Sequence, residues 1–184
     1  MSIPEIKIGD EARAELETIL TSTANTIAAE QNAVAPQLSE PFRSFVIHTP
    51  RELGRSTSKP ARGAGWLSLL YDGEEPCAVL EARWRRRRVR FSASTTGEWP
   101  RNINRAILWA EENQLLHEND QVAFLTVPCI GLTLLWIGGP DVMVPVVSRH
   151  GVERLRAYPT EEMRKAVSAA VTRVRAATGR GSTT

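Results

Sequence analysis

The chain has 184 residues, of which 42% are hydrophobic and 24% charged, and its formal net charge at pH 7 is +2. This length and composition are typical of one folded globular domain, so they exclude a disordered chain and a small scaffold that needs disulfides or a metal to fold. We expect a single domain over residues 1–179 and a disordered tail at 180–184.

Two features of the sequence indicate a cytoplasmic protein. Cys77 and Cys129 lie far apart in apolar runs without a CxxC spacing, which predicts free thiols packed in the core. Residues 1–16 carry carboxylates where a secretory signal has an apolar segment. We therefore expect a reducing environment and no export.

The first predicted element is a helix over residues 10–28, with Asp10 as its N-cap. Side chains recur there at the spacing of one helical stripe: Ala12, Leu16, Ile19, Leu20, Thr23 and Ile27. After two prolines, residues 42–49 read as a short strand. Residues 50–65 combine Pro, Gly and Ser with Arg51, Arg55, Lys59 and Arg62, which predicts a mobile basic loop outside the core.

A meander of strands follows this loop. Residues 65–71 and 77–84 read as two strands joined by the turn sequence DGEEP. Alternation predicts one shared apolar face for seven residues of the second strand and the strand after it: Ala78, Leu80, Ala82, Trp84, Val89, Phe91 and Ala93. The arginines between them then form a hairpin tip and the outer face.

The second half of the chain is predicted to contain a helix over 101–116 and strands over 121–127, 132–137 and 142–147. Residues 122–139 carry no charge and approach the length of a membrane span. Pro128, Gly131 and Gly139 favour strands separated by turns, buried on both faces. We expect no membrane insertion.

A last helix is predicted from Thr160, as its cap, to Gly179. Its buried stripe comprises Met163, Ala166, Val167, Ala170, Val171 and Val174. The order helix, strands, helix, strands, helix predicts an α+β fold in which three helices pack on a largely antiparallel sheet of about five to seven strands.

The segment ARWRRRRVRF is the strongest indication of function. It places six arginines within eight positions: Arg83, Arg85, Arg86, Arg87, Arg88 and Arg90. We interpret this basic surface, assisted by Arg55, Lys59, Arg62 and Trp99, as the site of a non-enzymatic adaptor that binds an acidic protein. Nucleic acid is the alternative partner, although stacking on bases is weakened if Trp84 and Phe91 point into the core.

A metal-dependent hydrolase is the third alternative. Asp72 with Glu81 and Arg83 resembles, over about a dozen residues, the D…ExK layout of metal-dependent nucleases, in which two carboxylates hold Mg²⁺. Here arginine stands in place of the lysine and cannot exchange a proton with water, and Asp72-Gly73 is also an ordinary turn sequence. This layout therefore ranks last.

No other motif indicates chemistry. His48, His117 and His150 are isolated, and the sequence has no nucleotide-binding loop or nucleophile elbow. We expect no cofactor and no metal. Sequence leaves the oligomeric state open, a homo-oligomer included.

Overall fold

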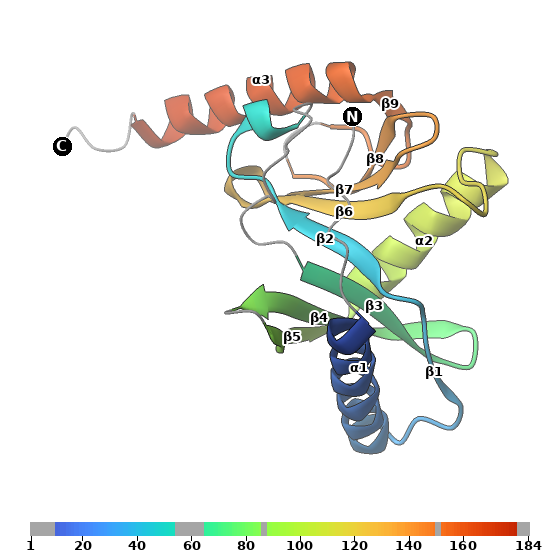
Figure 1. Cartoon of the computed structure of the whole chain (residues 1–184). Coiled ribbons are helices and arrows are strands. Elements are labelled where there is room, and N and C mark those ends of the chain that lie inside the picture. The colour runs from blue at the N-terminus through green and yellow to red at the C-terminus, as the bar shows by residue number, and fades with distance from the viewer. Residues whose placement is uncertain (1–9, 54–64, 86–87, 150–151, 180–184) are drawn as a thin grey trace.

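The structure is a computed structural model that describes residues 10–53, 65–85, 88–149 and 152–179. The described part contains three helices and nine strands (Figure 1). The helices are α1 (Asp10–Gln31), α2 (Glu98–Glu112) and α3 (Thr160–Gly179). The strands are β1 (Pro36–Leu38), β2 (Phe42–Val46), β3 (Gly65–Asp72), β4 (Glu75–Arg85), β5 (Arg88–Thr96), β6 (Val122–Val127), β7 (Leu132–Ile137), β8 (Val142–Val147) and β9 (Tyr158–Pro159).

All nine strands belong to one sheet with the order β5-β4-β3-β2-β6-β7-β8-β9, while β1 pairs with β3 beside β2. Only the β2–β6 pair among the described strands is parallel, so the predicted α+β fold, its order of elements and its largely antiparallel sheet are confirmed. The predicted number of strands was too low. β1 and β9 have three and two residues, too few for an alternating pattern to be recognised.

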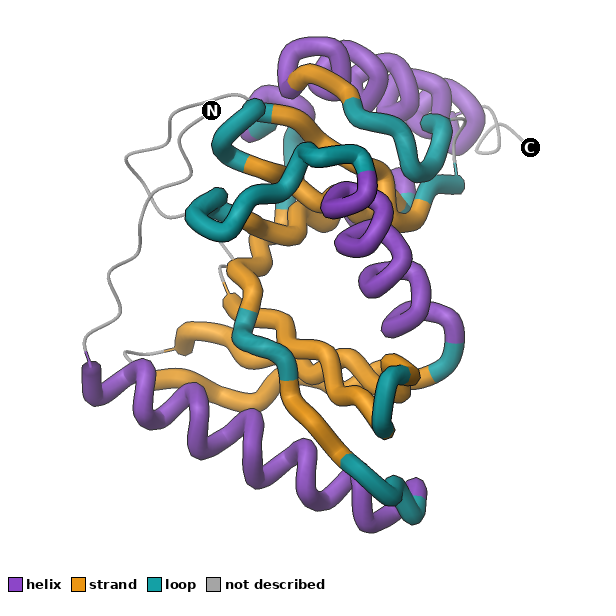
Figure 2. Tube along the Cα trace, turned by 90° about the vertical axis from the view of Figure 1, so that its right-hand side faces the viewer, coloured by secondary structure: helices purple, strands orange, loops and turns teal. Residues whose placement is uncertain are grey.

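The helices cover the sheet on both sides. The sheet bends, and Figure 2 shows its two halves on either side of α2. Figure 1 places α1 and α3 on the outer sides of the two halves. α1 buries Leu16, Leu20 and Ala24 against the half formed by β3, β4 and β5. The helix ends later than predicted, at Gln31, where Asn32 adopts a positive φ of 54° that stops helical propagation.

α2 packs against both halves of the sheet. Its buried residues Ile103, Ala106 and Ala110 share one cluster with residues of both halves: Leu67, Leu69, Val79, Phe124, Leu135, Ile137, Val144 and Val146. The predicted range of 101–116 was shifted, because the helix begins at Glu98 and includes Trp99 and Pro100 in its first turn. A proline is tolerated there since the first N–H groups of a helix have no intrahelical acceptor.

The C-terminal elements agree with the sequence. β6, β7 and β8 match the three predicted strands to within one residue, and every residue of β7 is buried. α3 packs on the outer face of these strands through Met163, Val167, Ala170 and Val171. Thr160, the predicted cap, is the first residue of α3, and its hydroxyl donates a hydrogen bond to the carboxylate of Asp141 (2.8 Å). Within the described residues, none of the helices combines the length and apolarity of a membrane-spanning segment.

Three further local expectations were wrong. Leu53 lies in the predicted basic loop, yet it is fully buried after the short 3-10 helix Pro50–Glu52 and packs in the core beneath α3. The strand predicted over 42–49 ends at Val46. Cys129 is exposed within the 3-10 turn Pro128–Ile130, whereas Cys77 is half-buried. The turn redirects an apolar run, so Pro128 and Cys129 face solvent although Val127 and Ile130 on either side are core residues.

Candidate functional site: the arginine hairpin

Four arginines lie on one face of the β4–β5 hairpin. Arg83 lies opposite Arg90, and Arg85 opposite Arg88. Residues two apart on a strand share a face, and so do directly opposed residues. The structure thus brings together Arg83, Arg85, Arg88 and Arg90, which we call the arginine face. Arg86 and Arg87, also predicted, lie outside the described residues.

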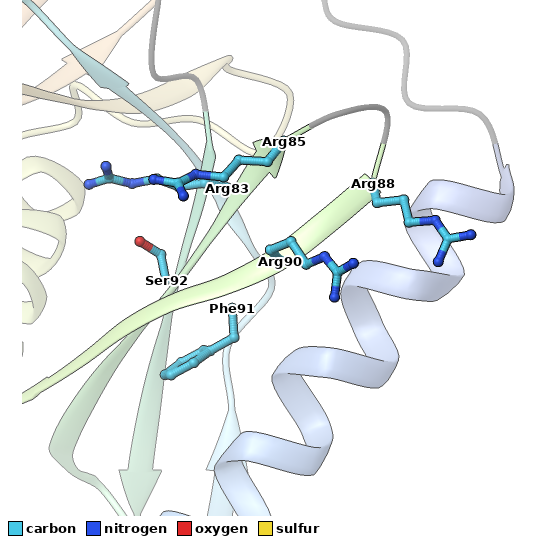
Figure 3. A pocket seen from close by; sticks show the side chains of 6 residues that line it. All are labelled: Arg83, Arg85, Arg88, Arg90, Phe91 and Ser92. Atoms are coloured by element: carbon cyan, nitrogen blue, oxygen red, sulfur yellow. The ribbon is translucent and has the colours of Figure 1, made fainter.

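A hollow of about 670 Å³ marks this surface. It is lined by Arg83, Arg85, Arg88, Arg90, Phe91 and Ser92. Figure 3 shows the arginines splayed, with Arg83 and Arg85 extending to one side of the hairpin and Arg88 and Arg90 to the other. Splaying separates like charges, and it leaves the guanidinium groups pointing outward from both strands.

The positive charge of the arginine face is poorly compensated within the described chain. Arg83 forms an ion pair with Glu81 on the same strand (3.6 Å). Among the described residues, no carboxylate lies within 4 Å of Arg85, Arg88 or Arg90. Glu81 lies opposite Ala93 and not opposite Arg90, so it does not face Arg90 across the hairpin.

The opposite face of the hairpin carries two exposed aromatic residues. Trp84 and Phe91 are each 43% exposed, which corrects the prediction that they point into the core. The predicted side was right, because they alternate with the arginines, but α1 leaves both rings partly exposed although Val89, opposite Trp84, is fully buried. Trp84 contacts Trp66 edge-on with ring centroids 6.4 Å apart.

A bulge changes the faces further along β5. Ala82 lies opposite Phe91, but Glu81 lies opposite Ala93, so β5 contains one extra residue at Ser92. The bulge moves Ala93 to the face of Glu81, which contradicts the prediction that it shares a face with Val89 and Phe91. It also places Ser92 at the hollow (Figure 3).

The outer edge of the hairpin lies beside α1. β5 is the last strand in the order of the sheet. The backbone N–H of Val89 donates a hydrogen bond to the Glu15 carboxylate (3.0 Å). A carboxylate of the chain itself therefore occupies the edge of the strand that carries Arg88 and Arg90.

The other residues predicted for the site are not gathered at the hairpin. Trp99 lies in the first turn of α2, half-buried against the core between the half-sheets, and not before the helix as the predicted range of 101–116 implied. Arg55, Lys59 and Arg62 lie outside the described residues.

The carboxylates of the nuclease-like layout are far apart. Asp72 lies opposite Glu75, and Glu81 follows six residues later on β4, about 20 Å away at the rise of a strand. The Asp72 carboxylate accepts hydrogen bonds from the backbone N–H groups of Val34 and Ala35 (2.9 Å each), which is a structural role. Within the described ranges, no three His, Cys, Asp or Glu side chains are grouped to hold a metal.

A second groove, which the sequence did not indicate, runs along α2. It has a volume of about 700 Å³, and its lining includes Glu74, Glu75, Arg101, Arg105, Leu108 and Glu112. Leu108 is 48% exposed because it lies outside the buried stripe of α2, and that departure from periodicity was visible in the sequence. Acidic and basic side chains both line the groove, so its charge does not favour a partner of either sign.

Comparison of the chain with protein families, with curated proteins and with solved structures gives no match.

Proposed function

We propose that the protein is a non-enzymatic binding module that holds an acidic segment of another protein on the arginine face. The observation that carries this proposal is the convergence of Arg83, Arg85, Arg88 and Arg90 on one face, where Glu81 is the one described carboxylate in ion-pair contact. Guanidinium groups bind carboxylates through two parallel hydrogen bonds. Alternate residues of an extended peptide have the same spacing as alternate residues of a strand, so the carboxylates of such a peptide match the spacing of the arginines.

Exposed Trp84 and Phe91 favour single-stranded nucleic acid as the second candidate, because bases stack on aromatic side chains. By alternation the rings lie on the face opposite the arginines, although Phe91 also lines the hollow and Trp84 does not. One strand lying on the arginine face therefore cannot also stack on both rings. For this reason the protein partner ranks first.

The test uses two fluorescent probes of similar charge and length. One is a capped decapeptide of alternating glutamate and threonine with five carboxylates, and the other is a hexathymidylate with five phosphodiester groups. Fluorescence anisotropy titrations at about 50 and 150 mM salt compare the unmodified protein with the triple variant Arg85→Gln, Arg88→Gln, Arg90→Gln. The matched control is Arg101→Gln, Arg105→Gln, Lys165→Gln, which removes the same charge from exposed positions on α2 and α3.

We expect the peptide to bind, to weaken with salt, and to lose about tenfold or more in affinity in the arginine variant, since each exposed ion pair contributes up to about 1 kcal/mol. The control should change affinity by less than about threefold. Equal losses in both variants would reject a specific arginine face. Tighter binding of the oligothymidylate than of the peptide would assign the site to nucleic acid.

A further inference from the structure

We propose that the acidic segment binds by adding a strand to the free edge of β5. This inference rests on the proposed function and states how the partner is held: an extended chain contributes main-chain hydrogen bonds to the edge and carboxylates to the arginine face. Strand addition to an exposed sheet edge is a general mode of peptide recognition, in which the backbone supplies affinity and alternate side chains supply specificity.

The direction of the backbone groups on β5 follows from one hydrogen bond. The N–H of Val89 reaches Glu15 on α1, so it points away from β4. In an antiparallel pair, outward and inward groups alternate along each strand. The backbone groups of β5 that point outward therefore belong to the residues paired with every second residue of β4 from Trp84 to Ala78. These residues of β5 are Val89, Phe91, Ser94 and Thr96; the step from Phe91 to Ser94 is longer because the bulge lies between them.

Beyond Val89, no described strand pairs with this edge. Glu15 occupies it at Val89, and the pairing of the described strands leaves Phe91, Ser94 and Thr96 without a strand on that side. Residues 92–96 contain no charged residue and no proline, the devices that usually prevent an edge from pairing. β5 has nine residues, enough for a paired partner of several residues.

Charge selects the occupant of this edge. Because Glu15 occupies the edge at Val89, a strand beside β5 extends from Thr96 as far as Phe91 and Arg90, and it places a side chain next to Arg90 on the arginine face at a Cβ separation of about 4.5–5.5 Å. Glutamate or aspartate at that position pairs with Arg90. A second copy of this chain would bring another set of arginines to the same edge and would be repelled, so we expect the partner to be a different, acidic protein.

The experiment uses the glutamate-threonine decapeptide in two N-methylated forms, one methylated at every threonine amide and one at every glutamate amide. Methylation removes N–H donors without changing the charge of the peptide. In an added strand, one set of amides faces β5 and the other faces solvent. One isomer should therefore lose about tenfold or more in affinity while the other binds like the parent, because alternate backbone groups point in opposite directions.

The identity of the weaker isomer gives the orientation of the added strand. The residue that pairs with Phe91 in an antiparallel arrangement shares its face, which is the one without arginines. This residue is a threonine when a glutamate lies beside Arg90. Loss with methylated threonine thus indicates antiparallel addition, and loss with methylated glutamate indicates parallel addition.

A protein variant gives a second, independent measurement. Ser94→Pro removes an outward N–H without removing a bond to β4, and Ser94→Ala is its matched control. We expect the proline variant to bind the peptide about fivefold more weakly and the alanine variant to bind it as tightly as the unmodified protein does. The methylated peptides are tested on the unmodified protein, so the inference remains testable if the proline variant does not fold.

Two outcomes separate failure of this inference from failure of the proposed function. If both methylated peptides bind like the parent while the arginine variant loses binding, strand addition is wrong and the arginine face stands. If the parent peptide does not bind, both proposals are wrong.

Discussion

The carboxylate of Glu15 on α1 accepts a hydrogen bond from the backbone N–H of Val89 on β5, with 3.0 Å between Oε2 and N. This contact joins residues 74 positions apart in sequence and ties the first helix to the outer strand of the sheet. It makes Glu15 a structural residue, whereas the nearby Glu11 is exposed on the same helix.

We expect Glu15→Ala to lower the free energy of unfolding by about 1–2 kcal/mol, because the Val89 N–H loses its acceptor in a partly buried position. Glu15→Gln keeps a carbonyl oxygen and should retain about half or more of this contribution. Urea unfolding followed by circular dichroism measures both variants, with Glu11→Ala as the surface control. A control as destabilised as Glu15→Ala would refute a specific role for the contact.

The arginine face should contribute little to stability. We expect Arg85→Gln, Arg88→Gln, Arg90→Gln to change the unfolding free energy by less than about 1 kcal/mol in either direction, because these arginines have no described ion-pair partner and repel one another. Thermal melts at low and high salt test this. Melting many degrees below the unmodified protein, with peptide binding retained, would show that the arginines stabilise the scaffold.

α3 should be essential to the core of the second half-sheet. Val171 is 6% exposed and packs in the cluster beneath α3, so Val171→Asp removes about 1.5–3 kcal/mol of burial and adds the cost of a buried carboxylate. We expect a loss of about 3 kcal/mol or more. Ala169→Asp, exposed on the same helix, should cost below about 0.5 kcal/mol. Denaturant titrations compare the pair, and equal stabilities would place α3 outside the core.

The two cysteines should differ in reactivity. Burial raises the pKa of the Cys77 thiol, whose Sγ donates a hydrogen bond to the Leu70 carbonyl (3.3 Å), so little of it is thiolate near neutral pH. Cys129 is exposed. Limited iodoacetamide treatment at pH 8 followed by mass spectrometry should modify Cys129 first. Cys129→Ser should abolish the fast phase and Cys77→Ser should preserve it; the reverse result would contradict the described burial.

Long periodic segments explain what could be predicted. α1 and α3 follow from apolar side chains that repeat every three to four residues, because one stripe of each helix is buried, whereas β6 to β8 follow from continuous apolar runs between turns, because both faces of these strands are buried. The grouping of arginines on a hairpin also followed from alternation. The sequence could not show where helical cover ends, so Trp84 and Phe91 were assigned to the core although α1 leaves both half-exposed.

Features that depend on contacts across the sheet escaped prediction. The bulge at Ser92 moves Ala93 to the other face, but a short polar stretch has no apolar alternation that would reveal an inserted residue. The burial of Leu53 depends on strands and a helix that come later in the chain. Asp72 and Glu81 looked close in sequence, but an extended strand separates them by its own length.

The parallel pairing of β2 with β6 has a consequence for how the protein forms during synthesis. Arg43 of β2 lies beside Ala123 of β6, so this edge stays unpaired until 80 more residues have been made. Ribosomes add about 5–20 residues per second, which is a delay of about 4–16 s. β3, β4 and β5 close as local hairpins within that time, and the nascent chain carries an open β2 edge until β6 emerges. Joining of the two half-sheets is therefore the step at which a stalled or truncated chain is most exposed to aggregation.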